Sequence, residues 1–260
     1  MSNKISYSEF KIWSDCPYKH KLLYIDRVKR FEGNEYTAFG TAIHSTCERR
    51  VLNEIVDEPS YFENIFEQEL EKLPSEVLET IGQEKVDELL EQGRVLAPIA
   101  VPELQKHFGD FEVVSVEESI FEDMDLAENT KFKGFIDLVI KTSDDKYHII
   151  DWKTCGWGWD SRRRTDTITT YQLSLYKHYF AKKHGIDPKN IETHFALLKR
   201  TAKKNNVEIF RVTSGAKKTE NALKLVAKAV HNISSGKHIK NRISCTSGYG
   251  CEFYKTKYCA

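Results

Sequence analysis

Residues 131–154 read KFKGFIDLVIKTSDDKYHIIDWKT. Two apolar runs are separated by the polar segment 142–146, a pattern typical of a β-hairpin. Asp137 interrupts the first run, and Asp151 and Lys153 close the second, one residue apart. Side chains two residues apart on a strand leave the same face, and a hairpin would bring Asp137 level with Asp151. The stretch therefore predicts a hairpin that carries two carboxylates and an ammonium at one end.

This group of side chains has the chemistry that phosphodiester hydrolysis requires. Two carboxylates supply the hard oxygen ligands that Mg²⁺ or Mn²⁺ prefers. The lysine could orient or deprotonate a water molecule, or offset charge in the transition state. The alternative is a surface hairpin with charged ends, because D-x-K is a short pattern that also occurs by chance.

The sequences GFID at 134–137 and DWKT at 151–154 resemble the motifs of the PD-(D/E)XK nuclease superfamily, and the G-x-x-D form is similar to its RecB-type branch. The resemblance implies an α/β fold with a restriction-endonuclease-like core, a central mixed β-sheet flanked by helices. It also implies that the main-chain carbonyl of Trp152 is a further metal ligand. We expect residues 1–260 to form one domain, in which 57–110 is a helical insertion punctuated by prolines.

Residues 40–48, GTAIHSTCE, match the branch's G-T-x-x-H-x-x-x-E motif. We expect a helix that Gly40 opens and that runs to about Val56. The resemblance implies that His44 is a metal ligand, whereas Glu48 would orient His44 or make a salt bridge. The alternative for His44 is a histidine whose hydrogen bonds are satisfied on an ordinary helix.

Two further segments are candidates for the same site. A helix is expected over 165–183, where Gln172 and Tyr176 share one face. These two residues match a Q-x-x-x-Y motif of the family, which implies that they border the active site. A strand is expected over 111–121, where Glu117 and Glu118 lie on opposite faces, so that one could join the metal site and the other would be exposed. The register decides which, and Glu117 is the candidate metal ligand.

The segment after the hairpin is rich in groups that bind nucleic acid. Trp157 and Trp159 alternate with glycines, and Arg162, Arg163 and Arg164 follow. Tryptophan can stack on bases and arginine can bind phosphates, so we expect a DNA-binding loop. The alternative is a loop whose tryptophans pack back onto the fold.

Six cysteines are present, and four of them lie near the two ends: Cys16, Cys245, Cys251 and Cys259. This layout resembles the iron–sulfur exonucleases of the same branch, such as the CRISPR spacer-adaptation nuclease and AddAB-type nuclease domains. The resemblance implies a [4Fe–4S] cluster that joins residue 16 to residues 245–259. The spacing here, C-x₅-C-x₇-C, departs from the usual C-x₂-C-x₅-C. Four thiolates could instead bind Zn²⁺ or remain free.

Composition limits the class of protein. The 260 residues are 40% hydrophobic and carry no net charge. Residues 51–128 hold 22 acidic and 4 basic side chains, whereas 151–260 hold 8 acidic and 22 basic ones. The basic half could face a polyanion. No run is long and apolar enough to span a bilayer and the start is polar, so we expect no membrane association and a cytoplasmic location, in a bacterial cell or a phage-infected host.

Together these features predict a Mg²⁺- or Mn²⁺-dependent DNA nuclease. The resemblance implies an exonuclease on single-stranded or end-bearing DNA in phage or bacterial replication, recombination or DNA processing, with a helicase, a recombinase or another replication protein as partner. Two alternatives are a non-catalytic DNA-binding recombination accessory protein and an RNA-directed nuclease. Basic and aromatic content does not separate RNA from DNA.

Overall fold

The structure is a computed structural model that describes residues 4–28, 33–248 and 250–259. Residue 249, inside the predicted cysteine segment 245–259, lies outside this range. The α-helices are α1 (Tyr7–Asp15), α2 (Pro17–His20), α3 (Glu35–Val51), α4 (Glu58–Glu71), α5 (Ser75–Ile81), α6 (Gln83–Phe108), α7 (Ser161–Thr165), α8 (Thr167–His184) and α9 (Ala216–Ser234). The strands are β1 (Lys4–Ser6), β2 (Phe111–Asp123), β3 (Lys131–Thr142), β4 (Tyr147–Cys155), β5 (Ile191–Lys199) and β6 (Val207–Val212). A π-helical turn, η1 (Lys21–Ile25), and two 3₁₀ turns, η2 (Pro188–Asn190) and η3 (Arg242–Cys245), complete the list.

The six strands form one mixed sheet in the order β1-β3-β4-β5-β6, with β2 paired to the other edge of β3. Pairs β2–β3, β3–β4 and β5–β6 are antiparallel, and β1–β3 and β4–β5 are parallel. The parallel pair β4–β5 is joined by a crossover through α7 and α8, as a parallel connection requires. The prediction of an α/β fold with a central mixed sheet flanked by helices is confirmed.

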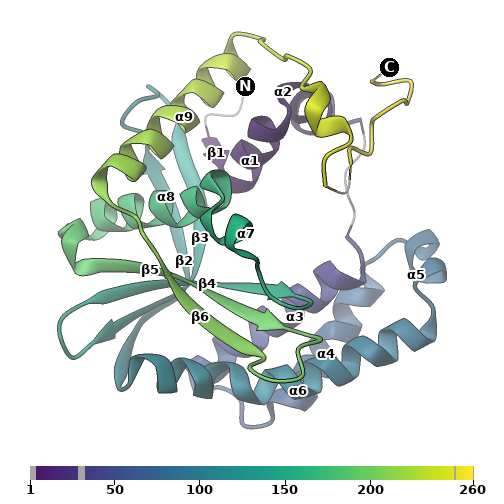
Figure 1. Ribbon diagram of the computed structural model, residues 1–260, viewed down its shortest axis with the longest axis vertical. Coiled ribbons are helices and arrows are strands. Elements are labelled where there is room, and N and C mark those ends of the chain that lie inside the picture. Colours follow the sequence, from purple (N-terminus) through teal and green to yellow (C-terminus); the bar gives the residue numbers. More distant parts are fainter. Residues whose placement is uncertain (1–3, 29–32, 249, 260) are drawn as a thin grey trace.

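Helices cover both faces of the sheet, and each face has its own core. On one face, α1, α8 and α9 pack through side chains such as Phe10, Tyr179 and Val226. On the other face, α3, α4 and α6 pack through side chains such as Phe39 and Phe66. Figure 1 shows α8 and α9 on one side of the strands and α3, α4 and α6 on the other. The sheet is therefore the middle layer of three.

The predicted hairpin is β3 and β4. Its turn is closed by the main-chain N–H of Thr142, which donates to the carbonyl of Lys146 at 3.0 Å, and Asp145 takes the left-handed conformation (φ 62°). The ladder between the strands runs from Lys141–Tyr147 to Leu138–Ile150. Nearer the start of β3, residues 131–133 pair with β1 instead. The two strands thus part immediately after Leu138–Ile150, at Asp137 and Asp151.

Three expectations about helix boundaries are wrong. The helix that contains Gly40 ends at Val51 and does not run to about Val56. Helix α3 begins at Glu35, because Asn34 caps it through the main-chain N–H groups of Tyr36 and Thr37. Gly40 therefore lies inside the helix and is not its entry. Pro98 and Pro102 do not punctuate the acidic region, because both lie within α6.

The segment 57–110 consists mainly of the three helices α4, α5 and α6. Gly93 on α6 makes close packing with α4 possible, since a Cβ there would lie 1.9 Å from the ring of Phe62. Within the part of the chain that the structure describes, no helix combines the length and the apolar character that crossing a bilayer requires.

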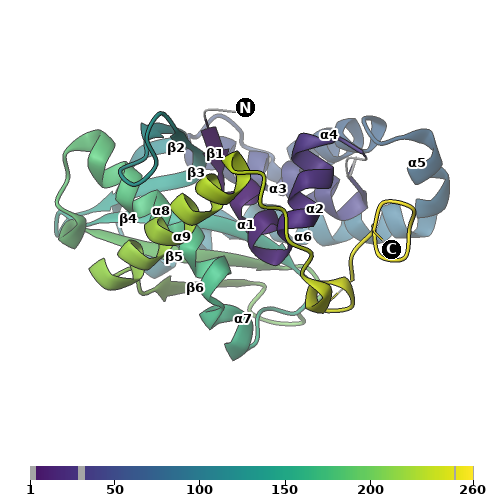
Figure 2. The same ribbon diagram turned by 90° about the horizontal axis from the view of Figure 1, so that it is seen from above.

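The C-terminal segment returns to the N-terminal helices. The main-chain N–H of Tyr18 donates to the carbonyl of Ile239 at 3.2 Å, and the side chains of Asn241 and Ser244 donate to the carbonyl of Asp15. Figure 2 shows this segment passing α1 and α2 after the end of α9. These contacts bring residues more than 220 positions apart in the chain into one region.

Candidate active site

The candidate site lies where β3 and β4 part. Asp137 is anchored by the main chain of the opposite strand, because its Oδ2 accepts a hydrogen bond from the N–H of Trp152 at 2.8 Å. His44, from α3, places its Nδ1 3.6 Å from the same Oδ2. The histidine thus reaches Asp137 from the helical layer that covers the sheet. The structure brings these two predicted ligands together.

Asp151 is 1% exposed and is held from two directions. Its Oδ1 accepts a hydrogen bond from Nε2 of Gln172 at 2.7 Å, and its Oδ2 lies 2.5 Å from Nζ of Lys153. Gln172 also contacts the hydroxyl of Tyr176, at 3.3 Å. Both residues come from α8, on the opposite face of the sheet from His44. The Q-x-x-x-Y pair therefore borders the two carboxylates.

Close packing explains why a glycine stands at position 134 in the GFID sequence. A Cβ at Gly134 would lie 2.8 Å from Cε1 of Tyr176, closer than such contacts occur. The ring of Tyr176 packs directly on the main chain of β3, and this contact sets the distance between α8 and the strand. Glycine at 134 is thus required for the position of Tyr176 beside Gln172.

Burial controls the ionisation of the two carboxyl groups. It raises the pKa of Asp137 and of Asp151 to about 6, although the Lys153 ammonium acts in the opposite direction on both. Burial also opposes the charge on Lys153, but the nearby carboxylates outweigh it and raise the pKa of this lysine. A cation at this position is favourable because it would offset two buried negative charges.

The protonation state of His44 suits a metal ligand. Burial and then the Lys153 ammonium lower the pKa of His44 to about 4. The imidazole is therefore neutral near pH 7 and has a lone pair for a metal ion. The buried oxygen Oδ2 of Asp151 has no well-aligned hydrogen-bond donor among the described residues. The donor set of two carboxylates and one neutral imidazole fits a divalent ion such as Mg²⁺ or Mn²⁺.

Glu117 and Glu48 form a second acidic pair beside Asp137. Burial, followed by the hydrogen-bonded Glu117 carboxyl, raises the pKa of Glu48 to about 8, so the pair holds a proton near neutral pH. Glu48 therefore pairs with Glu117, and its orientation of His44 stays a prediction. Glu117 takes a left-handed backbone conformation (φ 48°) and also raises the pKa of Asp137, which places it close to the predicted metal ligands.

Glu118 is not the exposed residue that the alternation suggested. Its carboxylate forms ion pairs with Lys183 and His184 on α8, and its side chain is 11% exposed. The two adjacent glutamates do face opposite sides of the sheet. They differ in partner, because one faces α3 and the other faces α8.

The loop after β4 separates its two tryptophans. Trp157 is 76% exposed, whereas Trp159 is 5% exposed and packs edge-on against Phe195 and Phe210. Trp159 cannot stack on a base, which corrects its assignment as a DNA-binding residue. Its place in the core anchors the loop that presents Trp157.

The three arginines also differ. Arg164 is bound to Glu208 at 2.6 Å and to the carbonyl of Trp159 at 2.8 Å, so it fixes the loop. Arg162 and Arg163 are exposed on α7. Arg163 stacks on Trp159 and is close enough to Lys153 to oppose its charge. Arg162 and Arg163 are thus the two arginines available to a phosphate near the site.

The four predicted cysteines line one cavity of about 330 Å³ between the N-terminal helices and the C-terminal segment. The main-chain N–H of Asn241 donates to Sγ of Cys16 at 3.3 Å. Burial and then the neighbouring Cys259, Cys251 and Cys16 raise the pKa of Cys245. The thiols therefore gather around a shared space although their sequence spacing is unusual.

Two features were not predicted from the sequence. Tyr7 is buried, donates to the carbonyl of Ile168 at 3.1 Å, and has its pKa raised by burial and then by Asp151. It therefore belongs to the surroundings of the site. The second feature is a cluster of His148, Glu192 and His194. Nothing in the local sequence marks either, because both depend on contacts between distant segments.

Comparison with known proteins identifies a family. The model of the family described as the PD-(D/E)XK nuclease superfamily matches residues 4–259. No curated protein gives a match.

Solved structures give a likeness in fold. A crystal structure of a candidate exonuclease from Eubacterium rectale is 13% identical, with a TM-score of 0.59, over 94% of this chain and 86% of that chain. The structure of a protein called SSO0001 is 15% identical over 86% of this chain and 85% of that chain, and its TM-score of 0.35 is too low to support an argument. The first of these supports the fold alone.

Proposed function

The chain belongs to the PD-(D/E)XK nuclease superfamily, and from this premise we propose that it is a Mg²⁺- or Mn²⁺-dependent nuclease that degrades DNA from a free end. The observation that carries the proposal is the convergence of Asp137, Asp151 and Lys153 where β3 and β4 part. His44 from α3 and the Gln172–Tyr176 pair from α8 complete the site.

The residues have separate roles in this proposal. Asp137, Asp151 and His44 would hold the ion, with the carbonyl of Trp152 as a further ligand and Glu117 as an outer acidic neighbour. A bound Mg²⁺ or Mn²⁺ supplies Lewis acidity at a phosphate oxygen and lowers the pKa of a water molecule.

Lys153 would orient the attacking water and offset charge in the transition state. Gln172 keeps Asp151 in position, and Tyr176 supports Gln172.

DNA would approach along the basic side of the site. Arg162 and Arg163 are exposed on α7, and Trp157 extends into solvent from the preceding loop. Arginines bind phosphates, and an exposed tryptophan can stack on an unpaired base. A single strand or a frayed end offers such a base, so we propose single-stranded or end-bearing DNA as the substrate.

We also propose that Cys16, Cys245, Cys251 and Cys259 bind a [4Fe–4S] cluster that joins the two ends of the chain. In a Zn²⁺ site with Zn–S bonds of about 2.3 Å, the sulfur atoms are roughly 3.8 Å apart. Among the described residues, no three of these sulfur atoms lie within 4.8 Å of one another. The wider spacing and the cavity of about 330 Å³ favour a cluster over a single ion.

The catalytic proposal is tested with Lys153→Ala in a Mn²⁺-dependent assay on end-labelled linear DNA and closed circular DNA. We expect cleavage of linear DNA only, and a loss of at least about 100-fold in the variant with DNA binding retained. Lys146→Ala, which changes a half-buried lysine at the turn end of the same hairpin, is the matched control and should cleave normally.

Other outcomes of this assay assign other functions. Unchanged cleavage by Lys153→Ala would overturn the catalytic assignment. Cleavage of circular DNA would show endonuclease action, and preference for a matched RNA oligonucleotide would show an RNA-directed enzyme. DNA binding without cleavage with either metal would indicate an accessory protein.

The cluster proposal is tested by anaerobic purification with a visible spectrum and analysis of iron and zinc. A brown protein with about four irons per chain is expected. A colourless protein that contains zinc, or neither metal, would remove the cluster and leave the nuclease proposal intact.

A further inference from the structure

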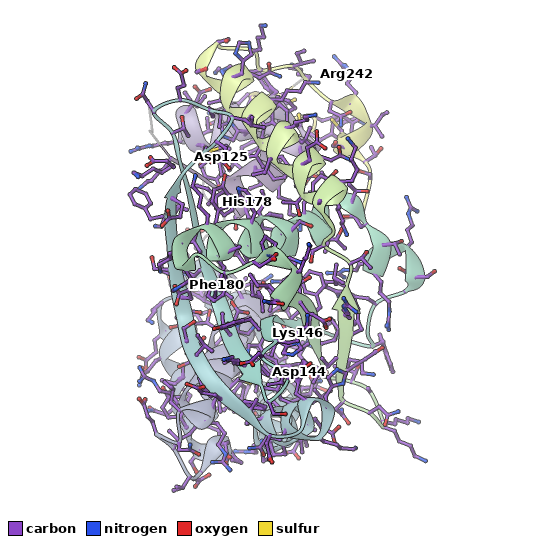
Figure 3. The ribbon with its side chains drawn as sticks, turned by 90° about the vertical axis from the view of Figure 1, so that its left-hand side faces the viewer. Asp125, Asp144, Lys146, His178, Phe180 and Arg242 are labelled. Atoms are coloured by element: carbon purple, nitrogen blue, oxygen red, sulfur yellow. The ribbon has the colours of Figure 1, made fainter. Side chains whose placement is uncertain are left out.

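A second group of potential metal ligands lies at the other end of the β3–β4 hairpin. His148 is on β4, and Glu192 and His194 are on the adjacent strand β5, where His148 is level with Glu192. Because side chains alternate along a strand, Glu192 and His194 share one face of the sheet. Figure 3 labels Asp144 and Lys146 in the hairpin turn, directly before His148 in the chain and far from the C-terminal region marked by Arg242.

The ligand atoms of the three side chains converge on one point. Nδ1 of His148 lies 3.1 Å from Nε2 of His194, and Oε2 of Glu192 lies 4.0 and 3.9 Å from these two atoms. In a tetrahedral Zn²⁺ site with bonds of about 2.0–2.1 Å, neighbouring ligand atoms are about 3.3–3.4 Å apart. In the described part of the chain, this is the only group of three such residues whose ligand atoms all lie within 4.8 Å of one another.

Neighbouring groups turn the correct atoms toward that point. The hydroxyl of Thr142 donates to Asp144 at 2.5 Å and can therefore accept a hydrogen bond from Nε2 of His148, 3.0 Å away. This arrangement puts the proton of His148 on Nε2 and leaves the lone pair on Nδ1, which accepts a hydrogen bond from Nε2 of His194 in the metal-free protein. A bound ion would require that proton to move to Nδ1 of His194. Metal-binding histidines are commonly oriented in this way by a hydrogen bond from the other ring nitrogen.

The carboxylate is oriented as well. Arg211 holds Oε1 of Glu192 at 3.0 Å, which leaves Oε2 directed at the histidines. The guanidinium is largely exposed, so it can retain its hydration when a cation binds nearby. Phe108, from the end of α6, covers both imidazoles, with ring centroids 4.8 and 5.0 Å away.

We propose that His148, Glu192 and His194 form a binding site for a divalent transition-metal ion of the Zn²⁺ type, separate from the nuclease centre. Two imidazoles and one carboxylate form a donor set that binds such ions in preference to Mg²⁺. Water or the exposed His107, whose ring centroid is 6.3 Å from that of His194, would complete the coordination. The ion would join β4 to β5 near the start of both strands.

The protonation states agree with this geometry. Burial and then His148 lower the pKa of His194 to about 3, and burial lowers the pKa of His148. Both imidazoles are therefore neutral near pH 7, as ligands must be. The site does not depend on the proposed nuclease activity.

The experiment uses Co²⁺ as a spectroscopic substitute for Zn²⁺, with the full-length chain in excess Mg²⁺. Excess Mg²⁺ competes for the nuclease centre, whose ligands are mainly carboxylate oxygens, and competes less for a site with two imidazoles. We expect one Co²⁺ per chain that shows only weak d–d bands, without the sulfur-to-cobalt charge-transfer band that the cysteines would produce. Bound metal is counted by equilibrium dialysis.

Two variants decide the assignment. His148→Gln should lose this Co²⁺, and Glu192→Gln, a half-buried residue whose change is less disruptive to folding, should weaken it at least tenfold. Glu208→Gln is the matched control, because Glu208 is a half-buried glutamate on the next strand that is also paired with an arginine, Arg164. Equal Co²⁺ binding by Glu192→Gln and Glu208→Gln, or wild-type protein without sulfur-free Co²⁺ bands, would overturn the proposal.

Discussion

The two ends of one hairpin carry buried ionisable groups of opposite kinds. At one end, burial raises the pKa of Asp137 and Asp151 to about 6. Three ladder positions away, it lowers the pKa of His148 and of its neighbour His194. Burial favours the neutral form of the side chain in both places. A neutral carboxyl group carries a proton and is a poor metal ligand, whereas a neutral imidazole has a lone pair that can bind a metal.

The difference teaches why one hairpin can support two kinds of site. Buried carboxylates need a cation or a lysine to remain ionised, so Lys153 is part of the first site. A buried imidazole stays neutral without a cation, and Thr142 supplies the hydrogen bond that fixes the tautomer of His148. Oxygen ligands suit Mg²⁺ or Mn²⁺, and nitrogen ligands suit Zn²⁺ or Co²⁺. Substitutions at either end of the hairpin test this comparison.

The largest expected effect is at the carboxylate end. Asp151→Asn should reduce the rate of DNA cleavage by about 10³-fold or more, because the amide is a poor metal ligand and no longer pairs with Lys153. The measurement is the initial rate on end-labelled linear DNA with Mn²⁺. Co²⁺ binding at the histidine end should persist.

Asp125→Asn is the matched control for this change. Asp125 is paired with His178 and Lys182 on the surface, and Figure 3 shows Asp125 and His178 near each other, away from the hairpin turn. Its rate should stay within about twofold, as expected for an exposed ion pair. A loss below tenfold in Asp151→Asn would show that this carboxylate is not part of the catalytic centre.

The next effect tests the packing behind the carboxylates. Gly134→Ala should slow cleavage by about 10- to 100-fold, because the new methyl group would displace Tyr176 and with it Gln172, the hydrogen-bond donor to Asp151. Steady-state rates should show a lower kcat. The control is Gly215→Ala, where an added Cβ meets no atom within 4 Å. If both variants cleave at the wild-type rate, Tyr176 has no positioning role.

The sequence was sufficient for the carboxylate end because its geometry is local. A turn of known length fixes the register of the hairpin, and the register places Asp137 beside Asp151. The histidine end was not predictable in this way. His194 reaches His148 only after the crossover through α8 places β5 beside β4.

The pairing of Glu48 with Glu117 also depends on tertiary structure, namely where α3 packs and the left-handed backbone at Glu117. Trp157 and Trp159 show the same dependence on tertiary structure, because composition does not indicate which of the two rings is buried in the core.

The two ends should respond differently to pH. A carboxyl group must lose its proton to bind a metal, so a pKa raised to about 6 means that metal affinity increases as the pH rises through 6. If both groups must be ionised, Mn²⁺ affinity should rise by about 15-fold between pH 5.5 and 7.5. His194, whose pKa burial lowers to about 3, is already neutral over this range, and burial lowers the pKa of His148 as well, so Co²⁺ affinity should change less than Mn²⁺ affinity.

Isothermal titration of the Asp151→Asn variant with Co²⁺, and of the His148→Gln variant with Mn²⁺, separates the two sites at each pH. Equal pH dependence at both ends would contradict the opposite pKa shifts on which the comparison rests.

The smallest expected effect is on the hydrogen bond behind His148. Thr142→Val preserves the shape of the side chain and removes the hydroxyl that accepts from Nε2 of this histidine. The ring can then place its proton on Nδ1, the atom that faces His194, so Co²⁺ affinity should fall by about tenfold. Thr130→Val, in an exposed turn, is the control, and competition with a coloured chelator measures both. Thr142 orients His148 in the way that Gln172 orients Asp151. If the Thr142→Val variant binds Co²⁺ like wild type, only the carboxylate end depends on a hydrogen-bonding neighbour.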